Sequence, residues 1–125
     1  MKKIFTDKAP AAIGPYSQAI VTGGLVFTSG QIPINPESGN IDATDIGAQA
    51  EQVCKNLCAV LEAASSSPEA VVKTTCFLSD MADFAVFNEV YSRYFPSCPA
   101  RSCVAVKALP KGSLVEIEAV AEVIK

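Results

Sequence analysis

The stretch from residue 99 to 118, PARSCVAVKALPKGSLVEIE, contains an arginine and a carboxylate in apolar surroundings. Arg101 begins a strand-like run over residues 101–107, and its planar guanidinium can bind a carboxylate or phosphate through paired hydrogen bonds. Glu118 lies in a second such run, residues 115–124, between apolar neighbours that would partly desolvate it. Desolvation raises the pKa of a carboxylic acid and makes its ionised form a stronger base. The two residues are therefore candidates for ligand binding and proton transfer.

Each of the two residues also has a purely structural interpretation. Arg101 can form a surface salt bridge, which contributes little to stability, and Glu118 can be a solvated glutamate in register with Glu116 and Glu122. The residues alone leave both interpretations equally open. To act together, the two side chains must project into one cleft. If their runs pair directly, they share a face only when facing residue numbers sum to an odd value; a cleft between subunits removes that restriction.

Five further residues are weaker candidates. Tyr16 ends a loop rich in proline and glycine, just before a strand. Ser29 and Gly30 end another strand, where small residues either let a ligand approach the backbone or form a bulge. Asn88 lies beside an aromatic stripe at helical spacing, as a structural hydrogen-bonding residue or a site residue. Cys103 has no base near it in sequence and is typical of a small core residue.

Composition excludes several classes of site. The chain has no histidine, which removes the commonest general base and metal ligand and every Ser-His or Cys-His nucleophile pair. Cys54 and Cys58 are four residues apart in a helical pattern, but a metal would need further ligands, so helix packing is expected. The net charge of −3 argues against nucleic-acid binding. No run approaches the ~18 apolar residues of a membrane span.

The five cysteines are odd in number, and four of them lie in periodic segments, which predicts reduced thiols in a cytoplasmic protein. The first residues contain no apolar segment of the kind found in signal peptides. At 125 residues the chain is expected to form a single domain over residues 1–125.

Apolar periodicity and turn residues predict an α+β domain with one sheet and two helices on one of its faces. The predicted helices cover residues 45–64 and 82–95, and the predicted strands cover residues 17–21, 25–29, 71–79, 101–107 and 115–124, with a short edge strand at 4–5. The Gly-Gly pair at 23–24 predicts a hairpin. Neither face of the run at 101–107 is strongly polar, whereas the last run has one apolar face and one that carries Glu116, Glu118 and Glu122. A small sheet with two helices cannot cover both of its faces, so the second face is expected to pack against other copies of the chain.

Taken together, these segments resemble the RidA/YjgF family of imine deaminases. The resemblance rests on PARSCV at 99–104, LVEIE at 114–118, GPYSQA at 14–19, FTSGQIP at 27–33, and VVKTT at 71–75 with Asp83, Phe84, Asn88 and Tyr91. It covers nearly the whole chain in order and with compatible spacing. Ser65 departs from the glycine expected after the long helix, which is a matter of helix capping and affects no site residue.

The resemblance implies a chorismate-mutase-like, YjgF-type fold with a single mixed sheet, and a homotrimer with ligand sites between subunits. It implies hydrolysis of 2-imino acids and their enamine tautomers, such as 2-iminobutanoate and 2-iminopropanoate, to 2-oxo acids and ammonia, without metal or cofactor. Arg101 would bind the substrate carboxylate, Glu118 would activate water as general base, and Tyr16 would hydrogen-bond near the imine nitrogen. The supporting residues would be Ser29, Gly30, Asn88 and Cys103.

Two alternatives remain beside the deaminase. An RNA-cleaving translation inhibitor is also associated with this family, but the acidic charge and the absence of histidine and of a basic stripe disfavour it. A binding module for 2-oxo acids would need Arg101 alone. Glu118 opposite a carboxylate ligand is expected mainly where a water must be activated.

Overall fold

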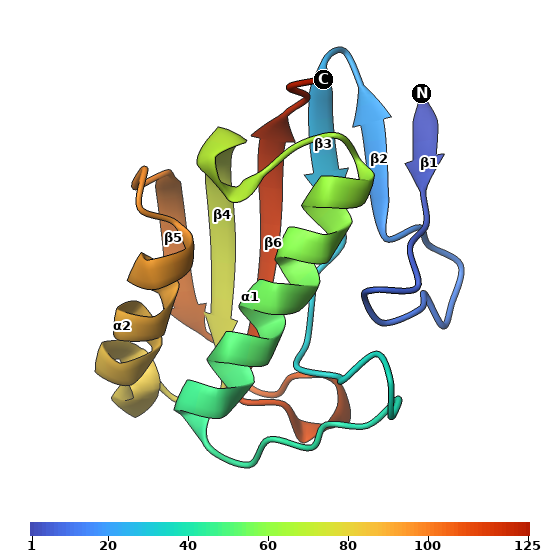
Figure 1. The fold of residues 1–125 in the computed structure, drawn as a ribbon. Coiled ribbons are helices and arrows are strands. Elements are labelled where there is room, and N and C mark those ends of the chain that lie inside the picture. The colour runs from blue at the N-terminus through green and yellow to red at the C-terminus, as the bar shows by residue number, and fades with distance from the viewer.

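The computed structural model describes residues 1–125 and contains a six-stranded sheet with two helices on one face (Figure 1). The strands lie in the order β1-β2-β3-β6-β4-β5; β4 and β5 are parallel, and all other neighbours are antiparallel. This arrangement confirms the predicted α+β fold. The elements are β1 (Lys2–Ile4), β2 (Ala19–Thr22), β3 (Leu25–Thr28), α1 (Ile46–Ala63), β4 (Val71–Leu78), α2 (Phe84–Tyr94), β5 (Ala100–Ala105) and β6 (Val115–Glu122).

Helix α1 is capped at its start by Asp45. The Asp45 carboxylate accepts a hydrogen bond from the Ala48 amide at 2.8 Å, which satisfies one of the free N–H groups of the first turn. The apolar stripe of the helix is buried against the sheet and includes Ala50, Val53, Leu57, Val60 and Leu61. Ser65 follows the helix with φ of +60°, so a serine occupies the left-handed position for which a glycine is expected.

The N-terminal strands confirm the predicted hairpin and shift its edges. Gly23 and Gly24 adopt φ values of +58° and +77° between β2 and β3. The edge strand lies at Lys2–Ile4, so it begins two residues and ends one residue before its predicted bounds. The chain leaves the sheet after Ile4 because the side chain of Gln18 bonds both the amide and the carbonyl of Thr6, at 2.7 and 3.0 Å.

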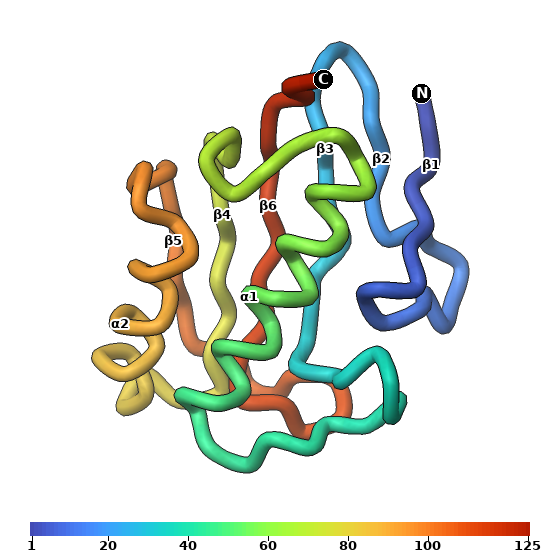
Figure 2. Tube along the Cα trace, viewed as in Figure 1, coloured from blue at the N-terminus to red at the C-terminus, as the bar shows by residue number.

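Strands β5 and β6 do not pair with each other, because β4 lies between them (Figure 2). Thr74 of β4 pairs with Arg101, and the next residue, Thr75, pairs with Glu118. Paired residues project to one face of a sheet and successive residues to opposite faces. Arg101 therefore lies on the face that carries the helices, and Glu118 lies on the open face. The alternative in which the two runs pair directly and share a face is wrong.

The open face of the sheet carries apolar side chains that no helix covers. Phe27 and Val104 are 42% and 47% exposed. Their neighbours on the same face, Ile20, Leu25, Phe77 and Val120, are partly exposed. An apolar sheet face of this kind is suited to packing against another surface. Neither helix has the length and hydropathy that crossing a membrane requires.

Candidate functional site

Arg101 stands near the start of the edge strand β5, next to helix α2. Its Nη1 donates a hydrogen bond to Oδ1 of Asn88 at 2.7 Å. The guanidinium lies over the ring of Tyr91, 4.8 Å from its centroid, and 5.6 Å from the centroid of Phe84. The ion pairs of the chain involve Arg93 instead, so Arg101 has no carboxylate partner. The surface-salt-bridge interpretation of Arg101 is therefore wrong, and a positioned cation remains free for a ligand.

Tyr91 is itself held rigidly. Its hydroxyl shares a hydrogen bond with the fully buried Thr74 hydroxyl at 2.7 Å, and its ring packs against Phe87 and Phe95 at 5.7 and 4.7 Å. Burial raises the pKa of Tyr91, so the phenol stays neutral. The aromatic stripe of α2 thus also provides the surface against which Arg101 lies.

A cavity of about 660 Å³ opens beside Arg101, between α2 and the approach to β5. The residues that line it include Asn88, Tyr91, Phe95, Pro96 and Pro99. It contains no carboxylate, so the charge that Arg101 presents to it is not neutralised within the chain. The arrangement can bind a small anion.

A second, more enclosed cavity of about 270 Å³ lies where three loops meet the start of β6. Tyr16, Gly30 and Glu116 line it. The Glu116 carboxylate lies directly against Gly30, and a β-carbon at residue 30 would overlap it. The missing side chain of Gly30 therefore makes the space that the carboxylate occupies.

Glu116 has the partly buried environment that the sequence predicts for Glu118. Glu116 is partly buried, and this burial, together with the nearby charge of Glu118, raises the pKa of Glu116. Glu118 is exposed, so of its two interpretations the solvated glutamate is confirmed and the desolvated one is wrong. The two glutamates lie on one face two residues apart, and the sequence motif EIE does not separate them. Gly30 distinguishes them, because the space left by its missing side chain is occupied by Glu116 and not by Glu118.

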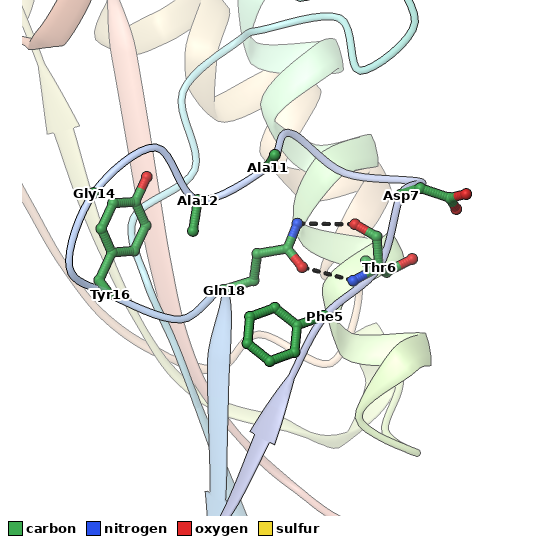
Figure 3. A pocket seen from close by; sticks show the side chains of 8 residues that line it. All are labelled: Phe5, Thr6, Asp7, Ala11, Ala12, Gly14, Tyr16 and Gln18. Atoms are coloured by element: carbon green, nitrogen blue, oxygen red, sulfur yellow. Dashed lines mark hydrogen bonds between the residues drawn. The ribbon is translucent and has the colours of Figure 1, made fainter.

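Tyr16 lies on the loop between β1 and β2 and is 51% exposed. It borders both the 270 Å³ cavity and a wide, open cavity of about 800 Å³ (Figure 3). Gln18, two residues later, is buried and fixes this loop: besides bonding Thr6, its Nε2 donates to the Pro10 carbonyl at 2.8 Å. The loop that carries Tyr16 is thus ordered by one side-chain amide.

The remaining candidates border none of these cavities with their side chains. The Ser29 hydroxyl donates to the Ser17 carbonyl at 2.5 Å and joins the ends of β2 and β3. Cys103 pairs with Cys76 across β4 and β5 and packs against the core. Burial raises the pKa of the Cys103 thiol and raises that of Cys76 to about 12, so both remain protonated.

The candidates fall into two groups within one chain. Tyr16, Gly30 and Glu116 form the first, around the smaller cavity. Asn88 and Arg101 form the second, beside α2. The groups lie on opposite faces of the sheet with β4 between β5 and β6, so a single chain does not bring Arg101 and a glutamate together.

Comparison with known proteins gives consistent matches over the whole chain. The family model described as endoribonuclease L-PSP matches residues 6–123. A RutC family protein of Pyrococcus abyssi is 55% identical over 94% of both chains. The 2-iminobutanoate/2-iminopropanoate deaminase of Escherichia coli is 48% identical over 96% of both. The crystal structure of Escherichia coli TdcF with bound serine superposes with a TM-score of 0.93 at 45% identity, covering 98% of each chain.

Proposed function

Because the chain belongs to the RidA/YjgF family, we propose that it hydrolyses reactive 2-imino acids, such as 2-iminobutanoate and 2-iminopropanoate, to 2-oxo acids and ammonia. The observation that carries the proposal is Arg101, oriented by Asn88 and Tyr91 and without an acidic partner. The deaminase name of the Escherichia coli relative supports it.

Arg101 binds the substrate carboxylate. Asn88 takes one N–H of Nη1, and the other guanidinium N–H groups remain to grip both carboxylate oxygens. The aromatic rings fix the plane of the guanidinium, which sets the direction in which the imine carbon points.

Glu116 acts as the general base. Burial and the nearby charge of Glu118 raise the pKa of Glu116, and a carboxylate with a raised pKa is a stronger base than an ordinary one. Glu116 takes a proton from a water molecule while the water oxygen bonds to the carbon of the protonated imine and the C=N electron pair moves to nitrogen, giving a neutral carbinolamine. Glu116 then gives this proton to the amino nitrogen and takes the proton of the hydroxyl group, so that the C–N bond breaks, the C=O bond forms and ammonia leaves; the proton left on Glu116 passes to solvent. Tyr16 borders the same cavity and hydrogen-bonds the nitrogen. Glu118 raises the pKa of Glu116 and remains the alternative base.

The reaction needs both groups of residues, so we place the complete site between two copies of the chain, in a homotrimer. The separation of Arg101 from Glu116 within one chain and the uncovered apolar face support this assembly. Addition of water to a C=N bond is acid–base chemistry, and the proposal assigns it no metal or cofactor. The five free cysteines suit a cytoplasmic setting.

The proposal is tested by imine turnover. A threonine dehydratase supplies 2-iminobutanoate, and the rate at which 2-oxobutanoate is released is measured with and without the protein. We expect acceleration by the wild type, and a loss of about 10²-fold or more in Glu116→Gln with retained binding of 2-oxobutanoate. Arg101→Ala should lose both binding and turnover, because the carboxylate anchor is gone. No acceleration by the wild type would refute the deaminase; binding without turnover would instead support a 2-oxo acid binding module.

A further inference from the structure

The pairing between β3 and β6 is interrupted where β3 ends. Phe27 of β3 pairs with Val120 of β6. The next pair along the two strands is Gln31 with Ile117. From one pair to the next the first chain advances four residues and β6 advances three, so one residue is in excess and the chain forms a β-bulge. A bulge is one of the two roles that the sequence allows for the small residues at 29–30.

The two sides of the bulge are attached to different strands. The Ser29 amide donates to the Gln18 carbonyl at 2.9 Å, so residue 29 continues the pairing with the chain of β2. The Gln31 amide donates to the Ile117 carbonyl at 2.8 Å, and the Ile117 amide donates back to Gln31 at 3.1 Å. Residue 31 is therefore attached to β6. Gly30 is the residue between these two attachments.

The Thr28 side chain closes the bulge at its start. Thr28 Oγ1 accepts a hydrogen bond from the Ala119 amide at 3.0 Å, so a side-chain oxygen attaches the chain to β6 just before the bulge. Ala119 is 4% exposed, so water has little access to replace this acceptor. Thr28 borders none of the cavities, and its hydroxyl can therefore act on the candidate site only through the backbone.

Gly30 connects the bulge to the proposed base. The Glu116 carboxylate lies against the Gly30 backbone, in the space that a β-carbon at residue 30 would take. Thr28 is bonded to β6 on one side of Gly30, and Gln31 is bonded to β6 on the other. The bulge therefore sets how closely the Gly30 backbone approaches Glu116, and with it how far the carboxylate is buried.

We infer that Thr28 is a positioning residue for the proposed reaction: its hydroxyl fixes the bulge at residues 28–31, which holds Gly30 against the Glu116 carboxylate. The inference rests on the proposed imine hydrolysis, in which Glu116 takes a proton from water. Arg101 belongs to β5, which β6 and β4 separate from β3. Loss of the Thr28 hydroxyl should therefore impair the chemical step and leave the binding of the substrate carboxylate intact.

The kinetic test compares three Thr28 variants in the dehydratase-coupled assay of imine turnover. Thr28→Val keeps the shape of the side chain but removes the acceptor, so kcat should fall about 10-fold while KM stays within about twofold. Thr28→Ser keeps the hydroxyl and should keep kcat within about twofold of the wild type. Thr28→Ala repeats the loss of the hydroxyl with a smaller side chain, so the result does not depend on how valine packs.

Ser66 provides the matched control. Its hydroxyl donates to the Glu122 carbonyl at 2.6 Å, at the other end of β6, and Ser66 is 6% exposed. Ser66→Ala therefore also removes a side-chain hydrogen bond to the backbone of β6, but away from Glu116. It should lower Tm and leave kcat unchanged. A purely structural role of Thr28 would instead make the two substitutions alike.

A second measurement needs no substrate. Burial and the nearby charge of Glu118 raise the pKa of Glu116. Tyr16 and Lys111 are the other ionisable residues that border the same cavity, and none of the variants changes them. Thr28→Val and Thr28→Ala should admit water to the carboxylate, so the pKa of Glu116 should fall toward its ordinary value. NMR titration of the labelled carboxyl carbon measures this fall, and the two control variants should keep the wild-type titration.

The outcomes separate the positioning role from the reaction. Wild-type kcat and wild-type Glu116 titration in Thr28→Val and Thr28→Ala would overturn the role of Thr28 while imine hydrolysis stands. Equal losses of kcat in Thr28→Ser or in Ser66→Ala would also overturn it, because neither the hydroxyl nor its place on the strand would then matter. A wild-type protein that does not accelerate imine hydrolysis would refute the reaction, and the titration would still show whether Thr28 holds the carboxylate.

Discussion

Removing the Tyr91 ring beneath Arg101 should weaken ligand binding by loosening the orientation of the guanidinium. The Tyr91 ring lies 4.8 Å from the Arg101 guanidinium, and a cation–π contact of this kind contributes about 0.5–2 kcal/mol. At about 1.4 kcal/mol per factor of ten, Tyr91→Leu should raise the Kd for 2-oxobutanoate about 2- to 30-fold. The Phe84 ring, at 5.6 Å, keeps part of the contact.

Tyr91→Phe is the matched control. It keeps the ring but removes the hydroxyl that bonds the buried Thr74, so it should cost about 1–3 kcal/mol of folding stability and leave ligand affinity within about twofold. Calorimetric titration gives Kd for each variant, and thermal unfolding gives Tm. If the leucine and phenylalanine variants bind equally tightly, the ring does not orient Arg101 and the reasoning is refuted.

Two further predictions concern Glu116. The pKa of Glu116 is raised, so kcat/KM should fall as the pH falls through that pKa, because protonation removes the base. Glu118→Gln removes a negative charge that raises the pKa of Glu116, so the acid limb of the pH profile should move to lower pH. An acid limb that does not move would contradict the assignment of Glu116 as the base. Gly30→Ala adds a β-carbon where the Glu116 carboxylate lies, so it should displace the carboxylate and lower kcat by about 10-fold or more. Circular dichroism should show that the variant keeps its fold. Unchanged turnover would mean that the Glu116 carboxylate is not the base.

Local patterns predicted the elements well. Helix α1 follows from its apolar stripe and the Asp45 cap, and the hairpin follows from two glycines that accept positive φ. Each depends on residues within a turn or two of one another. The observed strand boundary differs from the predicted one where a distant side chain binds the backbone. The Gln18 side chain hydrogen-bonds the backbone amide and carbonyl of Thr6, and β1 ends before that residue.

The order of the strands could not be predicted in the same way. The runs that carry Arg101 and Glu118 are joined by a short connection, which favours pairing, yet β4, from an earlier part of the chain, lies between them. Long-range pairing sets which face each residue occupies, and it therefore decided that Arg101 and Glu118 point apart.

The choice between Glu116 and Glu118 was also beyond local pattern. Both are flanked by apolar residues and share a face, so alternation treats them alike. Their difference lies in Gly30, which packs against Glu116 from the end of another strand. The residues alone left Arg101 as open as Glu118, and the structure gives Arg101 contacts with Asn88 and two aromatic rings but with no acid.

The central claim is that Arg101 of one copy and Glu116 of another form one site. The most direct test refolds Arg101→Ala and Glu116→Gln chains together in equal amounts. Each variant should be inactive alone. In a randomly mixed ring with sites between neighbours, about a quarter of the sites combine an intact Arg101 with an intact Glu116, so imine turnover should recover to about a quarter of the wild-type rate. Mixed oligomers without recovered turnover would contradict the account.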